Sequence, residues 1–251
     1  MVVRNRRTFI FKWAYRLRRY AEYYYQFFAF RSQDTRFCVL WKERYACLDD
    51  KTETTAFNQH HTYNVAWAAR ILQRINPEVC IDISSCILFN AIVSAFVPVK
   101  FYDYRPVNIK LSNLISGAAD LLQLPFAANS VQTLSCLHVL EHVGLGRYGD
   151  PLDSEGDLKA IAELKRVIAP GGNLILTVPI GQPKVIFNAE RIYSYAQIMR
   201  YFNEFELKEF SLIPDSGGLR TGATEAMCNI QDYGCGCFWL VKNGVASSAL
   251  K

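Results

Sequence analysis

The sequence predicts an α/β fold in which a mostly parallel β-sheet carries helices on both faces. Two observations support this prediction. From residue 79 onward, short apolar runs that suit strands alternate with segments of helical period, and this alternation is typical of parallel strand–helix–strand units. The chain has 251 residues, of which 51% are apolar, and this is enough to bury the core of one such domain.

The individual elements follow from the spacing of apolar residues and from turn residues. Apolar side chains share one helical face over residues 57–75, and Pro77 ends that helix because proline cannot continue it. Pro170-Gly171-Gly172 predicts a turn into a strand at 173–178. The other expected elements are strands at 79–83, 99–103, 131–137, 205–213 and 238–242, and helices at 86–96, 154–168 and 194–202.

Residues 1–50 differ from the rest of the chain in charge. Seven of the 28 basic residues precede the first acid, Glu22, and the remaining 21 face 23 acidic residues, so the excess positive charge belongs to the N-terminus. A polar stretch at 49–55 then interrupts the apolar pattern. We therefore expect a basic, aromatic-rich helical arm at residues 1–50 and an α/β domain at residues 51–251.

The arm has two interpretations. Its apolar residues recur at helical spacing and form one aromatic face, and a basic amphipathic helix of this kind binds anionic membrane surfaces. The same face also suits packing on the arm's own domain or on a partner, with the arginines in solvent. Both interpretations stay open, and a peripheral membrane contact would use residues 1–30. The face consists of Ile10, Trp13, Ala14, Leu17, Ala21, Tyr24 and Phe28.

Composition and charge limit the expected location and partners. No secretory signal pattern is found, and the longest uncharged stretch, residues 83–99, contains serines and an asparagine that suit a buried helix better than a membrane span. We expect a cytoplasmic protein that is peripheral to a membrane if the arm binds lipid. Because the basic charge is confined to the arm, no nucleic-acid partner is expected. The oligomeric state is not predicted.

The eight cysteines are expected to be free thiols, since no secretory signal accompanies them. Cys228, Cys235 and Cys237 form the one group that resembles a metal site. Cys-Gly-Cys lacks the two-residue spacer of a zinc knuckle and has no second pair. We therefore expect a strand edge there and no metal ion.

The region from residue 120 to residue 179 carries the clearest motifs. They are Asp120-Leu-Leu-Gln-Leu-Pro-Phe126, Asn129-Ser-Val131, Leu137-His-Val-Leu-Glu-His142, and Glu163-Leu-Lys-Arg-Val-Ile-Ala-Pro-Gly-Gly172 followed by the strand that ends at Pro179. In this order and spacing they resemble the central block of small-molecule class I, S-adenosylmethionine-dependent methyltransferases. A longer signature at 141–150, with 179–181 and 187–191, is similar to domain-of-unknown-function family 268, a methyltransferase-like group, over roughly residues 57–205.

This resemblance implies a three-layer Rossmann-like fold with a seven-stranded, mostly parallel sheet, and S-adenosylmethionine as cofactor. It places Asp103, an acid at the end of the second strand, at the ribose hydroxyls, since a carboxylate accepts two donors at once. It places Asp120 at the adenine amino group and the Leu121 N–H at the adenine ring. The full set of implied cofactor residues is Asp82, Ser84, Ser85, Asp103, Asp120, Leu121 and Leu137.

The loop after the first strand departs from the family pattern. Class I methyltransferases have a glycine-rich turn there, because the backbone must approach the cofactor closely. This chain reads Asp82-Ile-Ser-Ser-Cys86, without glycine. A Cβ at that position would clash with the cofactor or move it. The alternative to an enzyme is therefore a degenerate, non-catalytic methyltransferase-like module that binds or scaffolds.

His138-Val-Leu-Glu-His142 also satisfies the H-x-x-E-H pattern of one group of zinc proteases, with both histidines one turn apart on a helix. Glu163 is a candidate third ligand by composition only. Because the pattern lies in a methyltransferase-like block, we expect these residues to face a substrate, and zinc proteolysis is the minor alternative.

Methyl transfer depends mainly on alignment of the reacting groups. His138 and His142 are candidate bases by their pKa range, and Glu141 is a candidate orienting group; the bland alternative is histidines packed on the helix surface. The expected reaction is methyl transfer to an unidentified small polar molecule, for which a sugar is one acceptor class. Expected substrate contacts are Arg147, Tyr148 and Asp150 in a glycine-punctuated loop, and Asn188 and Arg191 after the next strand.

Overall fold

The computed structural model describes residues 6–244, with side chains from Trp13 onward. The chain divides into two compact units, Met1–Phe57 and Asn58–Lys251, and each unit is described by itself. Arg4 of the predicted basic arm lies outside the described residues, as do the side chains of the other basic and apolar arm residues before Trp13.

The first unit contains helix α1 (Arg6–Gln33) and a short 3₁₀ helix, η1 (Trp41–Glu43). The indole of Trp41 packs against one end of the predicted aromatic face, with ring centroids 5.3 Å from Tyr24 and 5.7 Å from Phe28. At the other end of that face, Trp13 is 59% exposed and Leu17 is 58% exposed. The face is thus covered within the unit at one end and open at the other. No described helix has the length and apolar character that crossing a membrane requires.

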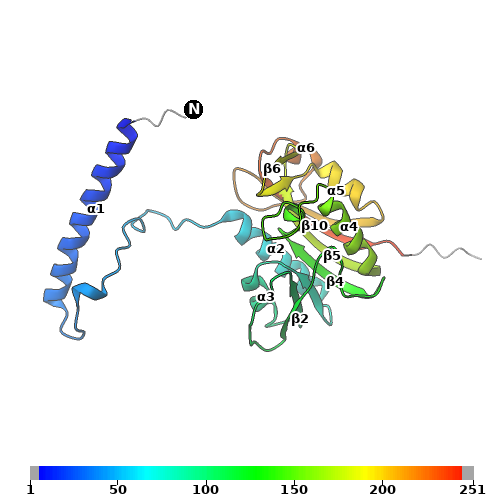
Figure 1. Ribbon diagram of the computed structural model, residues 1–251, viewed down its shortest axis with the longest axis horizontal. Coiled ribbons are helices and arrows are strands. Elements are labelled where there is room, and N and C mark those ends of the chain that lie inside the picture. The colour runs from blue at the N-terminus through cyan, green and yellow to red at the C-terminus, as the bar shows by residue number, and fades with distance from the viewer. Residues whose placement is uncertain (1–5, 245–251) are drawn as a thin grey trace, which may run out of the picture. The chain divides into compact units, whose positions relative to one another are not determined.

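The second unit is built on an eight-stranded sheet of order β3-β2-β1-β4-β5-β10-β8-β9 (Figure 1). Strands β1 to β5 are parallel to their neighbours, whereas β10 runs antiparallel to both β5 and β8, and β9 pairs antiparallel with β8. The strands are β1 (Cys80–Ile83), β2 (Val99–Asp103), β3 (Leu114–Ala118), β4 (Val131–Leu137), β5 (Ile168–Ile180), β8 (Phe205–Ile213), β9 (Arg220–Thr221) and β10 (Gly234–Lys242). A separate hairpin pairs β6 (Lys184–Ile186) with β7 (Glu190–Ile192).

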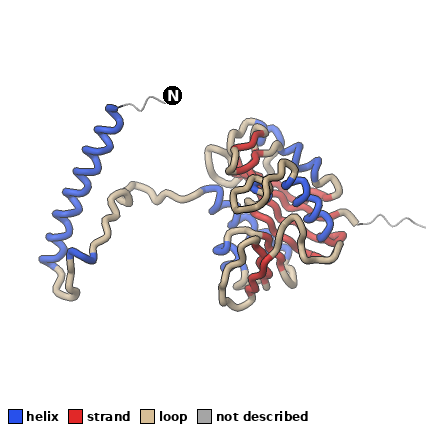
Figure 2. Tube along the Cα trace, viewed as in Figure 1, coloured by secondary structure: helices blue, strands red, loops and turns tan. Residues whose placement is uncertain are grey.

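Helices cover both faces of this sheet (Figure 2). On one face, α2 (Gln59–Ile75) and α3 (Ile87–Val93) bury a core cluster that includes Trp67, Ile71 and Phe89. On the other face, α4 (Gly156–Val167) and α5 (Tyr195–Tyr201) bury a second cluster that includes Leu164. The remaining helices are the 3₁₀ helix η2 (Leu140–His142) and α6 (Glu225–Asn229). The three-layer α/β fold predicted from the sequence is confirmed.

Helix α2 has well-defined ends. The Asn58 side chain caps its first turn by accepting a hydrogen bond from the backbone N–H of His61 at 3.1 Å. Asn76 ends the helix in the left-handed region, with φ of 48°, directly before Pro77. The cap fixes His60 and His61 in the first turn of the helix.

The sheet has more strands and a different turn than the sequence predicts. Eight strands replace the expected seven. Strand β3 was missed because its burial along the chain is uneven, so the period-2 signal is weak. The predicted turn at Pro170-Gly171-Gly172 lies inside the 13-residue strand β5, where the register to β4 shifts. The chain therefore bulges there and continues in the sheet instead of turning.

The sheet order creates a place for a ligand. From β1 the chain moves outward to β2 and β3, then returns to form β4 on the other side of β1. Ligands of open α/β sheets bind at such a switch point, outside the carboxyl ends of the strands. In this chain those ends carry Ser84 after β1 and His138 after β4.

The α2 core face generates a stability prediction. Leu72→Ala should lower the free energy of unfolding by about 3 kcal/mol, because it leaves a cavity at a fully buried position. Gln73→Ala, on the exposed side of the same helix, should change it by less than about 0.5 kcal/mol. Urea titration followed by circular dichroism measures both, and equal effects would contradict the packing of α2 on the sheet.

Candidate functional site

A buried carboxylate organises the loop after β1. Asp82 is fully buried and accepts three hydrogen bonds, from the Ser85 N–H at 3.1 Å, the Asn90 amide at 2.9 Å and the Ser135 hydroxyl at 2.5 Å. These donors come from the loop, from α3 and from β4. Burial raises the pKa of Asp82 to about 6, although the three donors act in the opposite direction.

Ser84 takes the conformation for which glycine is usually needed. Its φ is 54°, its N–H donates to the Tyr102 carbonyl at 2.7 Å, and its side chain lines a pocket. A left-handed residue with a Cβ costs roughly 1–2 kcal/mol. The glycine-free loop therefore makes the tight turn at the cost of local strain, which the hydrogen bonds around Asp82 offset.

Ser85 joins the ends of the two central strands. Its hydroxyl accepts the backbone N–H of Leu137 at 3.0 Å, at the end of β4. Asp82 and Ser85 are both buried and are not among the residues that line the pockets described below. Asp82 and Ser85 were predicted to contact a cofactor directly. In the structure their side chains instead make hydrogen bonds that hold the loop after β1 and the end of β4.

The first pocket lies at the carboxyl ends of β1, β2 and β4, and we name it the strand-end pocket. It encloses about 890 Å³ of space, part of which is open solvent. Asp103 and Asp120 each use one oxygen to hold the next turn, by accepting the N–H of Arg105 and of Leu122. The residues of this pocket used below are Ser84, Asp103, Asp120, Leu121, His138, His142, Tyr148 and Asp150.

The second pocket gathers all four histidines of the chain, and we name it the histidine pocket. His60 and His61 come from the first turn of α2, and His138 and His142 follow β4. The ring of His60 stacks 5.0 Å from that of Tyr233, and the ring of His61 lies 5.8 Å from that of His138. Burial, followed by the nearby His138, lowers the pKa of His60 to about 4 and also lowers the pKa of His61. Leu137 lines this pocket and not the strand-end pocket.

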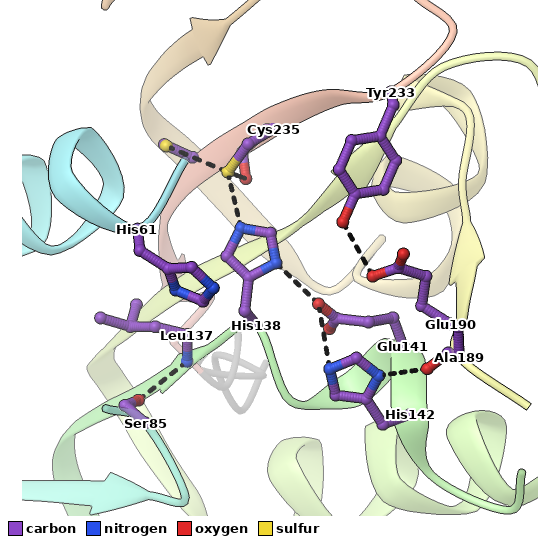
Figure 3. A network of polar contacts seen from close by, with 12 residues as sticks. His61, Ser85, Leu137, His138, Glu141, His142, Ala189, Glu190, Tyr233 and Cys235 are labelled. Atoms are coloured by element: carbon purple, nitrogen blue, oxygen red, sulfur yellow. Dashed lines mark hydrogen bonds and ion pairs between the residues drawn. The ribbon is translucent and has the colours of Figure 1, made fainter. Parts of the chain in front are cut away.

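His138 is held at both ring nitrogens (Figure 3). Its Nδ1 lies 2.7 Å from the Glu141 carboxylate and its Nε2 lies 3.2 Å from Cys235 Sγ. Burial opposes its protonation, but Cys235 and the Glu141 carboxylate outweigh burial and raise the pKa of His138. Because both ring nitrogens have partners, His138 is not free to act as the predicted base in this arrangement.

His142 has one nitrogen committed to the backbone. Its Nδ1 lies 2.7 Å from the Ala189 carbonyl, and its Nε2 lies 3.9 Å from the Glu141 carboxylate (Figure 3). A carbonyl oxygen only accepts, so Nδ1 carries the proton and a neutral His142 has its lone pair on Nε2. Arg147 donates to the same Ala189 carbonyl at 3.2 Å and lines the histidine pocket.

The H-x-x-E-H pattern does not form the predicted zinc-protease geometry. The backbone of His138 is left-handed, with φ of 55°, and only residues 140–142 form a 3₁₀ turn, so the two histidines are not one helical turn apart. Glu163 is engaged elsewhere, in an ion pair with Arg166 and with the Leu124 N–H. The protease interpretation is therefore wrong for this chain.

Of the predicted substrate residues, Arg147, Tyr148 and Asp150 line at least one of the two pockets, whereas Asn188 and Arg191 line neither. Tyr148 lines both pockets, and Asp150 lines the strand-end pocket while it accepts the N–H groups of Gly144 and Tyr148. Burial opposes ionisation of Asp150, but these backbone donors outweigh it and lower its pKa. Asp150 thus also shapes the loop that carries Tyr148.

Arg191 and Asn188 do not line either pocket, contrary to the prediction that they contact the substrate. The Arg191 guanidinium is buried, donates to the Val143 carbonyl at 2.6 Å and lies 3.5 Å from the Asp157 carboxylate, so it holds the loop between β4 and α4. Asn188 is exposed and is not a lining residue of either pocket. The strand predicted at 238–242 begins earlier, at Gly234, so Cys235 and Cys237 lie in the first part of β10, which is paired on both sides.

Sequence reasoning missed Glu190 and Tyr233. Both line the histidine pocket, and the Tyr233 hydroxyl donates to Glu190 at 2.8 Å (Figure 3). Glu190 lies in the signature at 187–191 but was not predicted as a site residue, Tyr233 lies in no recognised motif, and the two are 43 residues apart in the chain. The adjacent pair His60-His61 was a usable signal, since the chain has four histidines in all.

Asp82 generates a pH prediction. Its carboxyl holds a proton up to about pH 6 when folded but releases it near its ordinary pKa of 3.8 when unfolded, so its contribution to stability falls as pH rises through this window. Asp82→Asn does not titrate. The stability of the variant relative to wild type should therefore rise by about 2 kcal/mol between about pH 4.5 and pH 7. Urea titrations over this range measure it, and a difference independent of pH would contradict the buried carboxyl.

Comparison with known proteins gives the family context. Residues 119–213 match the family described as Caenorhabditis protein of unknown function, DUF268. No curated protein sequence matches the chain. The structure is similar to the N-methyltransferase NodS from Bradyrhizobium japonicum in complex with S-adenosyl-L-homocysteine, with a TM-score of 0.53 and 14% identity over 74% of this chain and 88% of that one.

A second similar structure is the YcgJ protein from Bacillus subtilis, with a TM-score of 0.51 and 13% identity over 74% of this chain and all of that one. A third is a putative methyltransferase from Haloferax volcanii, in complex with the Trm112 activator, with a TM-score of 0.51 and 14% identity over 74% and 91% of the two chains. At such identities the likeness concerns the fold. The second unit therefore has the fold of the class I methyltransferases, and residues 119–213 resemble DUF268.

Proposed function

We propose that this protein is an S-adenosylmethionine-dependent methyltransferase. One observation carries the proposal: the strand-end pocket and the histidine pocket share Ser84, His138, His142 and Tyr148. Two ligands in these pockets would meet at the shared residues. Methyl transfer needs this arrangement, because donor and acceptor must lie in line at close distance.

The strand-end pocket fits the cofactor. Asp103 is the last residue of β2 and is half-buried, so it can accept both ribose hydroxyls, as the similarity to methyltransferases implies. Asp120 and Leu121 line the same pocket on the side where the adenine is expected. When bound, S-adenosylmethionine supplies a methyl group already activated by the sulfonium. The left-handed Ser84 lets the backbone turn tightly at the methionine side without a glycine.

The histidine pocket fits a small polar acceptor. Its lining offers imidazoles, the Tyr233 hydroxyl, the Glu190 carboxylate and the guanidinium of Arg147. Of the three predicted catalytic residues, His138 and His142 line both pockets, and the buried Glu141 carboxylate lies 2.7 Å from His138 Nδ1 and 3.9 Å from His142 Nε2. The comparisons indicate no acceptor, and a sugar has no support beyond the pocket's polarity.

Calorimetric titration of the full-length protein with S-adenosylmethionine and S-adenosyl-L-homocysteine tests the proposal. We expect one-to-one binding of both. Asp103→Asn should weaken binding about tenfold, because it removes one charge-assisted acceptor, worth about 1.5 kcal/mol or more. Glu206→Gln, at an exposed position of β8, is the matched control and should bind like wild type.

Lack of binding by the folded wild-type protein would sink the enzyme proposal and leave the non-catalytic binding or scaffold module. Unchanged affinity in Asp103→Asn would remove the ribose assignment alone.

We also propose that residues 1–50 form a separate arm whose exposed end contacts anionic membrane surfaces. Trp13 and Leu17 are more than half exposed, and arginines flank them in α1. A Trp13→Ala/Leu17→Ala double variant should reduce co-sedimentation with phosphatidylserine vesicles several-fold, since it removes the apolar contact. Equal sedimentation of wild type and variant, or equal binding to neutral vesicles, would refute this contact.

A further inference from the structure

The starting point is a buried oxygen without a partner. Glu141 is fully buried, and its Oε1 accepts from His138, whereas no described residue contacts its Oε2 with a hydrogen bond. A buried carboxylate oxygen without a donor costs on the order of 1–3 kcal/mol or more. Such an atom in a native site takes a partner that the protein alone does not supply, which is a water molecule, a ligand or a cation.

Two further ligand atoms converge on this carboxylate. Glu141, His142 and Glu190 bring one ligand atom each within 4.8 Å of one another, the one such three-residue group among the described residues. In tetrahedral geometry, metal–nitrogen and metal–oxygen bonds of about 2.0–2.2 Å hold ligand atoms about 3.3–3.6 Å apart. Side-chain rotations that bring the ligand atoms closer by up to about 1 Å would therefore close the three side chains around one ion.

Each of the three side chains is oriented by a second residue. The Ala189 carbonyl takes the Nδ1 proton of His142 and leaves the Nε2 lone pair facing Glu141. His138 holds one oxygen of Glu141, and the Tyr233 hydroxyl donates to Oε2 of Glu190. A ligating histidine almost always donates its other N–H to a carbonyl or carboxylate, and ligating carboxylates are themselves hydrogen-bonded. The histidine pocket has this arrangement at all three positions (Figure 3).

We propose that Glu141, His142 and Glu190 bind a divalent transition-metal ion at the floor of the histidine pocket. One imidazole and two carboxylates suit Zn²⁺, Mn²⁺ or Fe²⁺ better than Ca²⁺ or Mg²⁺, which prefer oxygen alone. The ion offsets the charges of the two carboxylates, and the Glu141 carboxylate is fully buried with one oxygen that has no hydrogen-bond donor among the described residues. This site departs from the sequence expectation of no metal ion.

The position of the ion also narrows the acceptor class, and this part rests on the proposed methyl transfer. His142 lines both pockets, so an ion on its Nε2 lies near the junction where the acceptor would react. An acceptor with a hydroxyl or carboxylate oxygen can ligate the ion through a position that the three side chains leave open. Coordination lowers the pKa of such a hydroxyl, as it does for metal-bound water. The favoured acceptor is therefore an oxygen nucleophile.

The experiment uses chelator-treated full-length protein with a removable tag. Calorimetric titration with Zn²⁺ should show one ion per chain, and Co²⁺ should give visible absorption bands of a protein-bound ion. Glu190→Gln should weaken Zn²⁺ binding at least tenfold because it removes a ligand. Tyr233→Phe should weaken it about 10–100-fold, as loss of an orienting partner does. Glu78→Gln, an exposed glutamate away from both pockets, is the matched control and should bind Zn²⁺ like wild type.

The outcomes separate this proposal from the proposed function. Absence of Zn²⁺ and Co²⁺ binding by folded wild type, or unchanged Zn²⁺ affinity in Glu190→Gln, would overturn the metal site. Titration of Glu190→Gln with S-adenosyl-L-homocysteine should match wild type, since Glu190 does not line the strand-end pocket. Wild type that binds Zn²⁺ but no S-adenosyl-L-homocysteine would refute methyl transfer while it upholds the ion.

Discussion

The buried carboxylate of Asp82 fixes the geometry on which both pockets depend. It draws donors from the β1 loop, from α3 and from β4 to one point, and Ser85 then holds the end of β4 through the Leu137 N–H. The residues that directly follow β1 and β4 are Ser84 and His138, and both have left-handed backbones. Strained residues of this kind persist where surrounding contacts hold them, and they gather at functional sites.

The same junction explains how one fold builds two pockets of different character. The β1 and β2 side presents acids at strand ends, and the β4 side presents histidines. The loop after β4 is held from behind by Arg191, whose guanidinium reaches several of its carbonyls. Within this loop, the Asp150 carboxylate accepts a hydrogen bond from the Gly144 N–H. Rigid support of this kind keeps a polar site in place without help from a ligand.

Much of the fold was predictable, because strands such as 99–103, 131–137 and 205–213 are marked by apolar runs with clear ends. Strand β3 and the hairpin of β6 and β7 were not, since they are short and partly exposed. Pocket lining was predicted where a residue follows a strand, as for Asp103 and Asp120. Arg191 looked like a ligand residue but is buried, because charge in a sequence does not reveal which carbonyls lie within reach. Glu190 and Tyr233 depend on contacts between distant segments, which no local pattern records.

Strand β10, near the end of the sequence, completes the histidine pocket. It inserts between β5 and β8 and brings Cys235 to His138, and Tyr233 just before it brings a hydroxyl to Glu190. The rings that pack against Tyr233 and His138 are those of His60 and His61, more than 170 residues earlier in the chain than Tyr233. On the ribosome, the histidine pocket cannot exist until residue 235 has emerged from the exit tunnel. A ligand of this pocket therefore cannot engage an unfinished chain, and its binding reports that synthesis and folding of this region are complete.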